Sequence, residues 1–424
     1  MTSWENDIGY DSGHNMFAYG EAGYWSMLSD GRGAKHANDT SQGDLLAVTK
    51  AVHFMQHDPP EPFVLFLATR GAHPPYGAPP EYTHKWTLDQ VKQHVKLRPP
   101  NDPRKPRYHQ PDVGIQHYRN LTELGESTFY EIQRTYLEMV SFTDWTFGQL
   151  LAGLEAANGG TLAANTAVFH SSDHGDFAGD YRLVEKWPGA ADDVLTHVPM
   201  AARIPGGLPH NVAKGPVQSM DMMETMLELA GIESDWVRFG RSLAPLMREG
   251  TADGADDLTR MVYAEGGFYY RSELFPGGSD HVPDDPHGMY WPRAQEEMSG
   301  NGTGSPKWVM VRNLTHKLVY RPTGVSELYD LTADPRELDN VYGESQYAQV
   351  RQELVDHLTA WLIRTGDVPP LRNDPRGPPK NPNPIDAETC ASLLQPDPSR
   401  VQQLREEAAA SDLMSINGIP NFSL

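Results

Sequence analysis

Apolar residues recur at three- and four-residue steps in two stretches of the chain, which is the spacing of an amphipathic helix. The stretch over residues 44–57 starts at Asp44 and stops before Pro59, whose ring cannot continue a helix. The stretch over residues 128–156 stops before the Asn-Gly-Gly sequence of residues 158–160, which readily adopts the left-handed backbone that follows many helices. The pattern therefore predicts a helix over each stretch.

Short, continuous apolar runs alternate with the helical patterns, and such runs are typical of strands buried on both faces. They occupy residues 63–69, 167–170 and 198–204, and a Met-rich helical pattern follows over residues 218–230. Helices that alternate with buried strands predict an α/β fold, with a mixed and mostly parallel sheet between helices. We place this α/β domain at residues 1–255.

The pattern changes beyond residue 256, where short alternating runs indicate antiparallel strands joined by turns. These runs cover residues 261–264, 308–312, 317–320 and 327–329, and a helical stripe follows over residues 344–364. They predict a small C-terminal α+β subdomain over residues 256–366. Residues 367–424 form a tail that is rich in proline, with one short helix predicted over residues 398–410.

Charge and composition narrow the possible functions. The formal net charge is −22, so no basic field is present to attract a nucleic acid. The single cysteine, Cys390, excludes an internal disulfide framework and a cysteine-rich zinc site. No stretch approaches the roughly 18 apolar residues of a membrane span, and residues 1–7 show no signal peptide. The localisation stays open.

Two of the predicted strands lead into polar residues, at the place where α/β proteins bind their ligands. The first run leads to His73, and the second leads to Asp173 and His174. A carboxylate and an imidazole side by side can both bind one divalent cation. In isolation an Asp-His-Gly sequence is more often a capped turn with an exposed histidine, so the surrounding sequence decides between the two interpretations.

That surrounding sequence contains four blocks that follow one another in the order of a known family. They are residues 62–76 (PFVLFLATRGAHPPY), residues 169–200 with FHSSDHGD, GDY, Lys186 and VPM, residues 240–243 (GRSL), and residues 326–337 (SELYDLTADPRE). The chain resembles the sulfatase family of the alkaline-phosphatase-like superfamily in all four blocks. One such match would be weak, but the ordered set covers about residues 44–365.

The resemblance implies an activity and roles for four residues. The activity is the metal-dependent hydrolysis of sulfate esters, small or glycan. Asp173 and His174 are expected to bind a divalent metal, typically Ca²⁺. Lys186 is expected to contact the sulfate and offset charge on the bridging oxygen, and His73 to hydrogen-bond the sulfate or protonate the leaving group. A cation, an ammonium and an imidazole can together stabilise one anion, so we expect these side chains to meet at one end of a shared sheet.

The sequence also departs from the family pattern. The family begins with an Asp-Asp metal pair and a Cys-x-Pro-Ser-Arg segment whose cysteine becomes formylglycine, and neither precedes residue 44 here. Asp192-Asp193 follows the Asp-His block and is interpreted as a solvated loop. Cys390 lacks the proline and arginine of the family segment and is interpreted as incidental. Without the inner strands that such a segment supplies, the sheet is expected to expose a long edge.

Three interpretations of this departure stay open. The chain is an N-terminally incomplete version of an active enzyme, which we rank first, or one piece that assembles with a separate N-terminal chain, or a degenerate homologue that only binds. The alternatives to sulfate-ester hydrolysis are the hydrolysis of phosphate or phosphonate monoesters by the same kind of site, and non-catalytic binding of an anion or a carbohydrate.

Overall fold

The structure is a computed structural model. It describes residues 32–366, except for 58, 60–61, 75, 94–101, 111–120, 210–211, 234–236, 251–256 and 268–305. The Pro-rich tail, Cys390 and the helix expected over residues 398–410 therefore lie outside the described residues.

The chain divides into two compact units, each built from several segments. The first takes Met1–Pro205, Ala264–Met310 and Leu318–Tyr347, and the second takes Gly206–Tyr263, Val311–Lys317 and Ala348–Leu424. The predicted domain boundaries at residues 255 and 366 stay predictions.

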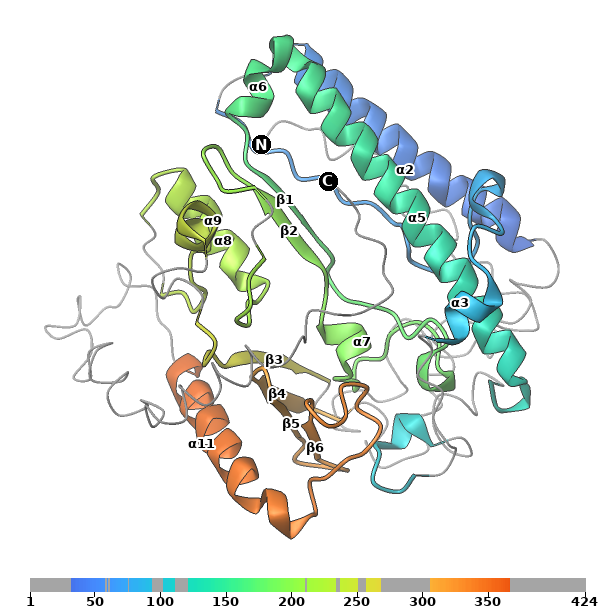
Figure 1. The fold of residues 1–424 in the computed structure, drawn as a ribbon, viewed down its shortest axis with the longest axis vertical. Helices are drawn as coiled ribbons and strands as arrows, with labels where there is room; N and C mark the ends of the chain where they lie inside the picture. Colours follow the sequence, from blue (N-terminus) through green and yellow to red (C-terminus); the bar gives the residue numbers. More distant parts are fainter. Residues whose placement is uncertain are drawn as a thin grey trace, which may run out of the picture. The chain divides into compact units, whose positions relative to one another are not determined.

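Two long helices of the first unit, α2 (Arg32–Gln56) and α5 (Glu126–Ala156), pack side by side along their length (Figure 1). A glycine sets their closest approach, because a Cβ atom at Gly153 would lie 2.5 Å from Cγ2 of Val52. Helix α5 ends as the sequence predicts, since Asn158 and Gly159 turn into the left-handed region with φ of 47° and 62°. The other helix begins well before the predicted residue 44.

The strands β1 (Val168–Ser171) and β2 (Met200–Arg203) form an antiparallel pair, in which Val168 faces Arg203 and Ser171 faces Met200. The predicted strands are therefore present, but the mostly parallel sheet is not found among the described strands. The connection between β1 and β2 holds a loop and the four-residue helix α7 (Asp193–Thr196). It lacks the crossover helix that usually returns a chain to a parallel position, and this explains the antiparallel direction.

The apolar run over residues 63–69 is not a strand in the structure, contrary to the prediction. Its start and its end are held: the Phe63 ring contacts Phe54 with centroids 5.3 Å apart, and the Gly71 N–H donates to the Asp44 carboxylate at 2.8 Å. Between them, Val64 is 92% exposed. An extended segment becomes a strand only when a neighbouring strand accepts its hydrogen bonds, and no described strand pairs with it.

A four-stranded sheet follows in the order β3-β4-β5-β6. Its strands are Val262–Gly266, Trp308–Arg312, His316–Tyr320 and Glu327–Asp330, and each lies within two residues of its predicted position. The predicted C-terminal helix is α11 (Ala348–Thr365). The Met-rich helix is α8 (Met220–Leu229), and α9 (Ala244–Glu249) follows it.

Shorter helices fill the connections. They are α3 (Leu88–Lys92), α6 (Thr161–Ala164) and the 3-10 turns Pro80–Tyr82, Arg107–His109, Leu121–Glu123, Ala157–Gly160, Asp180–Arg182 and Ser345–Tyr347. Among the described helices none is both long and apolar enough to cross a membrane.

A buried ionic cluster in the first unit joins the loop after residue 100 to β6. Glu327 accepts hydrogen bonds from Arg321 and from the Tyr329 hydroxyl, and the Lys105 ammonium lies 3.7 Å from its carboxylate. Burial alone would raise the pKa of Glu327, but the charges of Arg321 and Lys105 outweigh burial and hold that pKa below its ordinary value. Glu327 is therefore a buried carboxylate that depends on both cations.

Asp192 belongs to the same region and corrects the interpretation of Asp192-Asp193 as a solvated loop. Its carboxylate accepts a hydrogen bond from the Tyr108 hydroxyl at 2.8 Å and contacts His109 Nε2 at 3.0 Å. Only 4% of Asp192 is exposed, and the following residue, Asp193, starts α7. Asp192 is therefore a buried structural residue, and Asp193 is only partly buried.

The close contact of α2 with α5 predicts opposite effects for two glycine-to-alanine changes in α5. Gly153→Ala should lower the free energy of unfolding by about 1–3 kcal/mol, because its methyl group collides with Val52. Gly148→Ala should raise that free energy by about 0.5–1 kcal/mol, because its Cβ meets no atom within 4 Å. Urea unfolding measures both. Equal effects of the two changes would contradict the packing described here.

The ionic cluster predicts acid sensitivity. The lowered pKa of Glu327 means that its contribution to stability is fully present above about pH 4.5, its ordinary value, and is lost as the pH falls through the lower folded value. Glu327→Gln should cost about 3–5 kcal/mol at pH 7, because Arg321 and Lys105 stay buried without their counter-ion. Below pH 4.5 the free energy of unfolding should also fall less steeply in the variant than in wild type, because Gln cannot be protonated. Urea unfolding at several pH values measures this difference. An unchanged decline would contradict this assignment.

Candidate functional site

His73 and Lys186 meet in the first unit, although 113 positions separate them in the chain. The Lys186 ammonium donates a hydrogen bond to His73 Nε2. On the other side of the ring, Nδ1 lies 2.6 Å from the Pro74 carbonyl oxygen, which can only accept. These two partners fix the imidazole as the tautomer with its proton on Nδ1 and its lone pair on Nε2.

The same surroundings keep the imidazole of His73 neutral. Burial lowers the pKa of His73, and the positive charge of Lys186 lowers it further. The charge of His174 acts in the same direction. At neutral pH the His73 ring therefore adds no positive charge of its own to the site.

Asp173 and His174 follow β1 directly, as the sequence predicts. The His174 Nδ1 atom lies 2.9 Å from the Gly175 carbonyl oxygen, and its Nε2 atom lies 3.5 Å from Asp173 Oδ2. A backbone carbonyl that fixes the second ring nitrogen is the usual support of a metal-binding histidine. Gly175 permits the tight turn, because a Cβ there would lie 1.9 Å from the Val194 carbonyl oxygen.

These two side chains offer one carboxylate oxygen and one ring nitrogen to a cation. In the part of the chain that the structure describes, no group of three or more His, Cys, Asp or Glu side chains is placed to hold a metal ion. Ca²⁺ takes six to eight oxygen ligands, so Asp173 and His174 supply only a small part of a calcium shell. Their role as metal ligands and the choice of Ca²⁺ both stay predictions.

Tyr76 and Asp176 also belong to the site, and the sequence reasoning did not assign them a role. The Tyr76 hydroxyl donates to Asp176 Oδ1 at 2.6 Å and accepts from the Glu185 N–H at 2.8 Å. Burial raises the pKa of Asp176 to about 6, and hydrogen bonds from Tyr76 and from the Ala178 N–H only partly offset burial. The sequence signal is the short spacing of Tyr76 from His73, which suggests a shared site without giving the partner.

Helix α5 packs against the two segments that carry the site residues. Tyr76 and Val184 pack into one buried cluster with the α5 residues Phe129, Ile132 and Met139. The segment that carries His73 and the segment that carries Lys186 therefore rest on the same helix. This shared support explains how two distant segments bring their polar side chains together.

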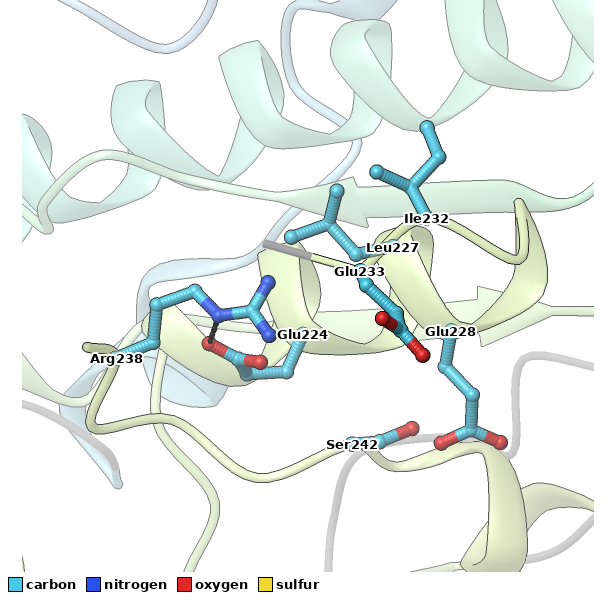
Figure 2. Close-up of a pocket in the computed structure, with 7 residues that line it drawn as sticks. All are labelled: Glu224, Leu227, Glu228, Ile232, Glu233, Arg238 and Ser242. Carbon is cyan, nitrogen blue, oxygen red and sulfur yellow. Dashed lines mark ion pairs between the residues drawn. The ribbon is translucent and has the colours of Figure 1, made fainter. Parts of the chain in front are cut away.

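A separate pocket of about 450 Å³ lies in the second unit (Figure 2). Its lining includes Glu224, Glu228, Glu233 and Arg238, and the Arg238 guanidinium pairs with Glu224 at 3.2 Å. Three carboxylates against one guanidinium would repel an anionic ester. The pocket contains none of the expected site residues, so it is a poor candidate for that ligand.

Comparison with known proteins gives the family. The sulfatase family model matches residues 3–232, which is more than half of the chain. The chain belongs to the sulfatase family. The match includes His73, Asp173, His174 and Lys186.

Curated relatives in the sulfatase family agree with this assignment. The uncharacterized sulfatase YidJ of Escherichia coli K12 is 24% identical, with 79% of this chain and 58% of that protein aligned. The multifunctional alkaline phosphatase superfamily protein PehA of Trinickia caryophylli is 22% identical over 77% of this chain and 61% of its own length. Arylsulfatase K of Gallus gallus is 27% identical over 66% of this chain and 48% of its own length. The chain thus spans roughly half to three fifths of the length of these relatives.

Solved structures show the same fold. The 2-O GAG sulfatase BT1596 matches with a TM-score of 0.53 and 20% identity, over 80% of this chain and 67% of that chain. The phosphonate monoester hydrolase of Agrobacterium radiobacter matches with a TM-score of 0.56 and 20% identity, over 79% of this chain and 64% of that chain. The sulfatase fold is therefore shared with enzymes named for two different esters.

The contact between Lys186 and His73 predicts a change in titration. Lys186→Ala should raise the pKa of His73, because it removes a positive charge that opposes protonation of the ring. Lys92→Ala, at an exposed lysine of α3, is the matched control and should leave that pKa unchanged. NMR titration of the His73 ring protons measures both. A His73 pKa that is the same in wild type and Lys186→Ala would show that the two groups do not meet.

Proposed function

We propose that this chain belongs to a sulfate-ester hydrolase and binds the ester's anionic group at His73 and Lys186. The observation that carries the proposal is the contact between the Lys186 ammonium and His73 Nε2. The Lys186 ammonium lies 3.8 Å from the Glu185 carboxylate, and its side chain keeps 30% of its surface exposed. An anion can reach this exposed part of the lysine. In a chain with a net charge of −22, such a local cation is needed to hold an anionic substrate.

The pair supports a role on the leaving-group side of the reaction. In the contact between Lys186 Nζ and His73 Nε2, the ammonium is the donor and the neutral imidazole is the acceptor. A sulfate ester breaks at its bridging oxygen, which gains negative charge as the alcohol leaves. The ammonium offsets that charge, and the pair can deliver the proton to this oxygen.

Asp173 and His174 are proposed as ligands of a divalent cation, with Ca²⁺ as the proposed ion. When bound, such a cation neutralises charge on the non-bridging oxygens of the ester. The support is the orientation of His174, whose Nδ1 is engaged by the Gly175 carbonyl while Nε2 faces Asp173. Other ligands are required to complete the shell.

The nucleophile is not assigned to this chain. Its single cysteine, Cys390, is followed by Ala-Ser-Leu-Leu and lacks the proline and arginine of the family segment. We therefore propose that the chain as printed binds sulfate esters without turning them over. The substrate is proposed to be a small or glycan sulfate ester, and one structural neighbour is solved with D-glucosamine-2-N,6-O-disulfate.

A second candidate is the hydrolysis of phosphate or phosphonate monoesters. Its support is the fold shared with the phosphonate monoester hydrolase, at a TM-score of 0.56. A phosphate monoester carries up to two negative charges at neutral pH and a sulfate monoester carries one, so one ammonium and a divalent cation can serve either. The third candidate, a non-catalytic binder of anions or carbohydrates, shares the binding step and differs only in the complete protein's turnover.

Titration calorimetry with 4-nitrophenyl sulfate and 4-nitrophenyl phosphate tests the proposal in the presence of Ca²⁺. We expect tighter binding of the sulfate ester, no release of nitrophenol, and a roughly 10- to 100-fold weaker affinity for Lys186→Ala, which lacks a charge-assisted hydrogen bond. Lys92→Ala is the control and should bind as wild type does. Tighter binding of the phosphate ester would favour the second candidate, and release of nitrophenol would overturn the proposal that this chain holds no nucleophile.

A further inference from the structure

The loop that carries Lys186 has an unusual backbone. Ala178, Tyr181, Arg182 and Glu185 all have positive φ, at 44°, 56°, 61° and 64°. Side chains with a Cβ rarely adopt this region, so such conformations persist only where the surroundings enforce them. Glu185 immediately precedes Lys186, so its backbone angles decide where the ammonium points.

Hydrogen bonds hold Glu185 on both sides of its Cα atom. Its carbonyl oxygen accepts from the Phe177 N–H at 2.8 Å, which closes the loop on itself. Its N–H donates to the Tyr76 hydroxyl at 2.8 Å and to Asp176 Oδ1 at 3.1 Å. The first bond is internal to the loop, whereas the bond to Tyr76 connects the loop to the segment of His73.

Tyr76 is well placed to fix this connection. Only 4% of it is exposed, its ring packs in the cluster on α5, and its hydroxyl donates to Asp176 Oδ1 while accepting from Glu185. Both hydrogen-bonding functions of the hydroxyl are therefore used. Because Tyr76 lies three residues after His73 and Glu185 lies one residue before Lys186, this single hydroxyl ties together the two halves of the contact.

We propose that Tyr76 is a positioning residue, which acts with Asp176 to hold Glu185 in its left-handed conformation and so directs the Lys186 ammonium to His73. The inference deepens the proposed function and rests on it for the role of Lys186. Tyr76 does not touch the anion in this proposal. Its effect passes entirely through Lys186.

Tyr76→Phe tests the proposal, because it removes the hydroxyl and keeps the ring. We expect sulfate affinity, measured by calorimetry with sodium sulfate, to fall roughly fivefold to tenfold, the size of one lost positioning hydrogen bond. Tyr136→Phe is the matched control, since Tyr136 packs against the same cluster with its ring 6.4 Å from that of Tyr76. It makes no described bond to Glu185 and should bind sulfate as wild type does. Asp176→Asn weakens the hydrogen bonds that Asp176 accepts from Tyr76 and Glu185, and it should also lower the affinity for sulfate.

A double-mutant cycle separates positioning from general destabilisation. In a Lys186→Ala background, Tyr76→Phe should cause no further loss of sulfate affinity. Losses that add in the double variant, or an equal loss for Tyr136→Phe, would overturn the proposal. Thermal unfolding of each variant confirms that the folded protein is being compared.

A second readout distinguishes failure of this inference from failure of the proposed function. The ¹⁵N shift of His73 Nε2 reports the hydrogen bond from Lys186 whether or not an anion binds. It should change in Tyr76→Phe in the same direction as in Lys186→Ala, and it should stay constant in Tyr136→Phe. If the wild-type protein does not bind sulfate, the proposed function is wrong, and the ¹⁵N shift alone then tests the positioning role of Tyr76. An unchanged shift in Tyr76→Phe then overturns the positioning role.

Discussion

The hydrogen bond between the Glu185 N–H and the Tyr76 hydroxyl is the constraint on which the candidate site depends. The loop after β1 makes several turns that L-residues avoid, and without external partners it would relax to commoner backbone conformations. Helix α5 provides the platform for Tyr76 and for Val184, next to Glu185. The Lys186 ammonium and the His73 imidazole are thus placed by the packing and backbone hydrogen bonds of their segments, since their own side chains are only partly buried.

The proposed anion site lies in a protein that is acidic overall. The chain carries 57 acidic and 35 basic residues, so most of its surface repels anions at long range. In the proposed site the Lys186 ammonium would act on an anion over a few ångströms, whereas distant charges are screened by salt. The glutamate-lined pocket of the second unit has the opposite character, because three carboxylates and one guanidinium line it.

Periodicity predicted the elements whose signals are local. Helix α5 and the strands from β3 to β6 lie within two residues of their expected bounds, because apolar spacing and Gly or Asn at the ends act over a few residues. Strand direction was wrong for β1 and β2, since direction depends on how the chain returns and not on the composition of either strand. The run over 63–69 has the composition of a strand, but pairing also requires a neighbour that no local pattern can specify.

In the candidate site, too, local sequence signals predicted some residues and missed those that depend on contacts between distant parts of the chain. Ordered motifs predicted His73, Asp173, His174 and Lys186 as site residues, and the structure brings the first and last of them into contact. The role of Tyr76 was missed because it depends on a backbone N–H 109 positions away. Asp192 was misassigned as solvated because its burial depends on Tyr108 and His109, which lie in a stretch without periodic signal.

The exposed run near Phe63 has a practical consequence for handling the protein. Val64 and Phe66 show 92% and 87% of their surface to solvent, and no strand in the described part of the chain pairs with the backbone beside them. Such a segment can pair with the same segment of another copy, so association should grow with concentration. The negative charge of each copy opposes this encounter at low ionic strength, and added salt removes that protection. A preparation that is monomeric in dilute buffer should therefore begin to aggregate when salt is raised.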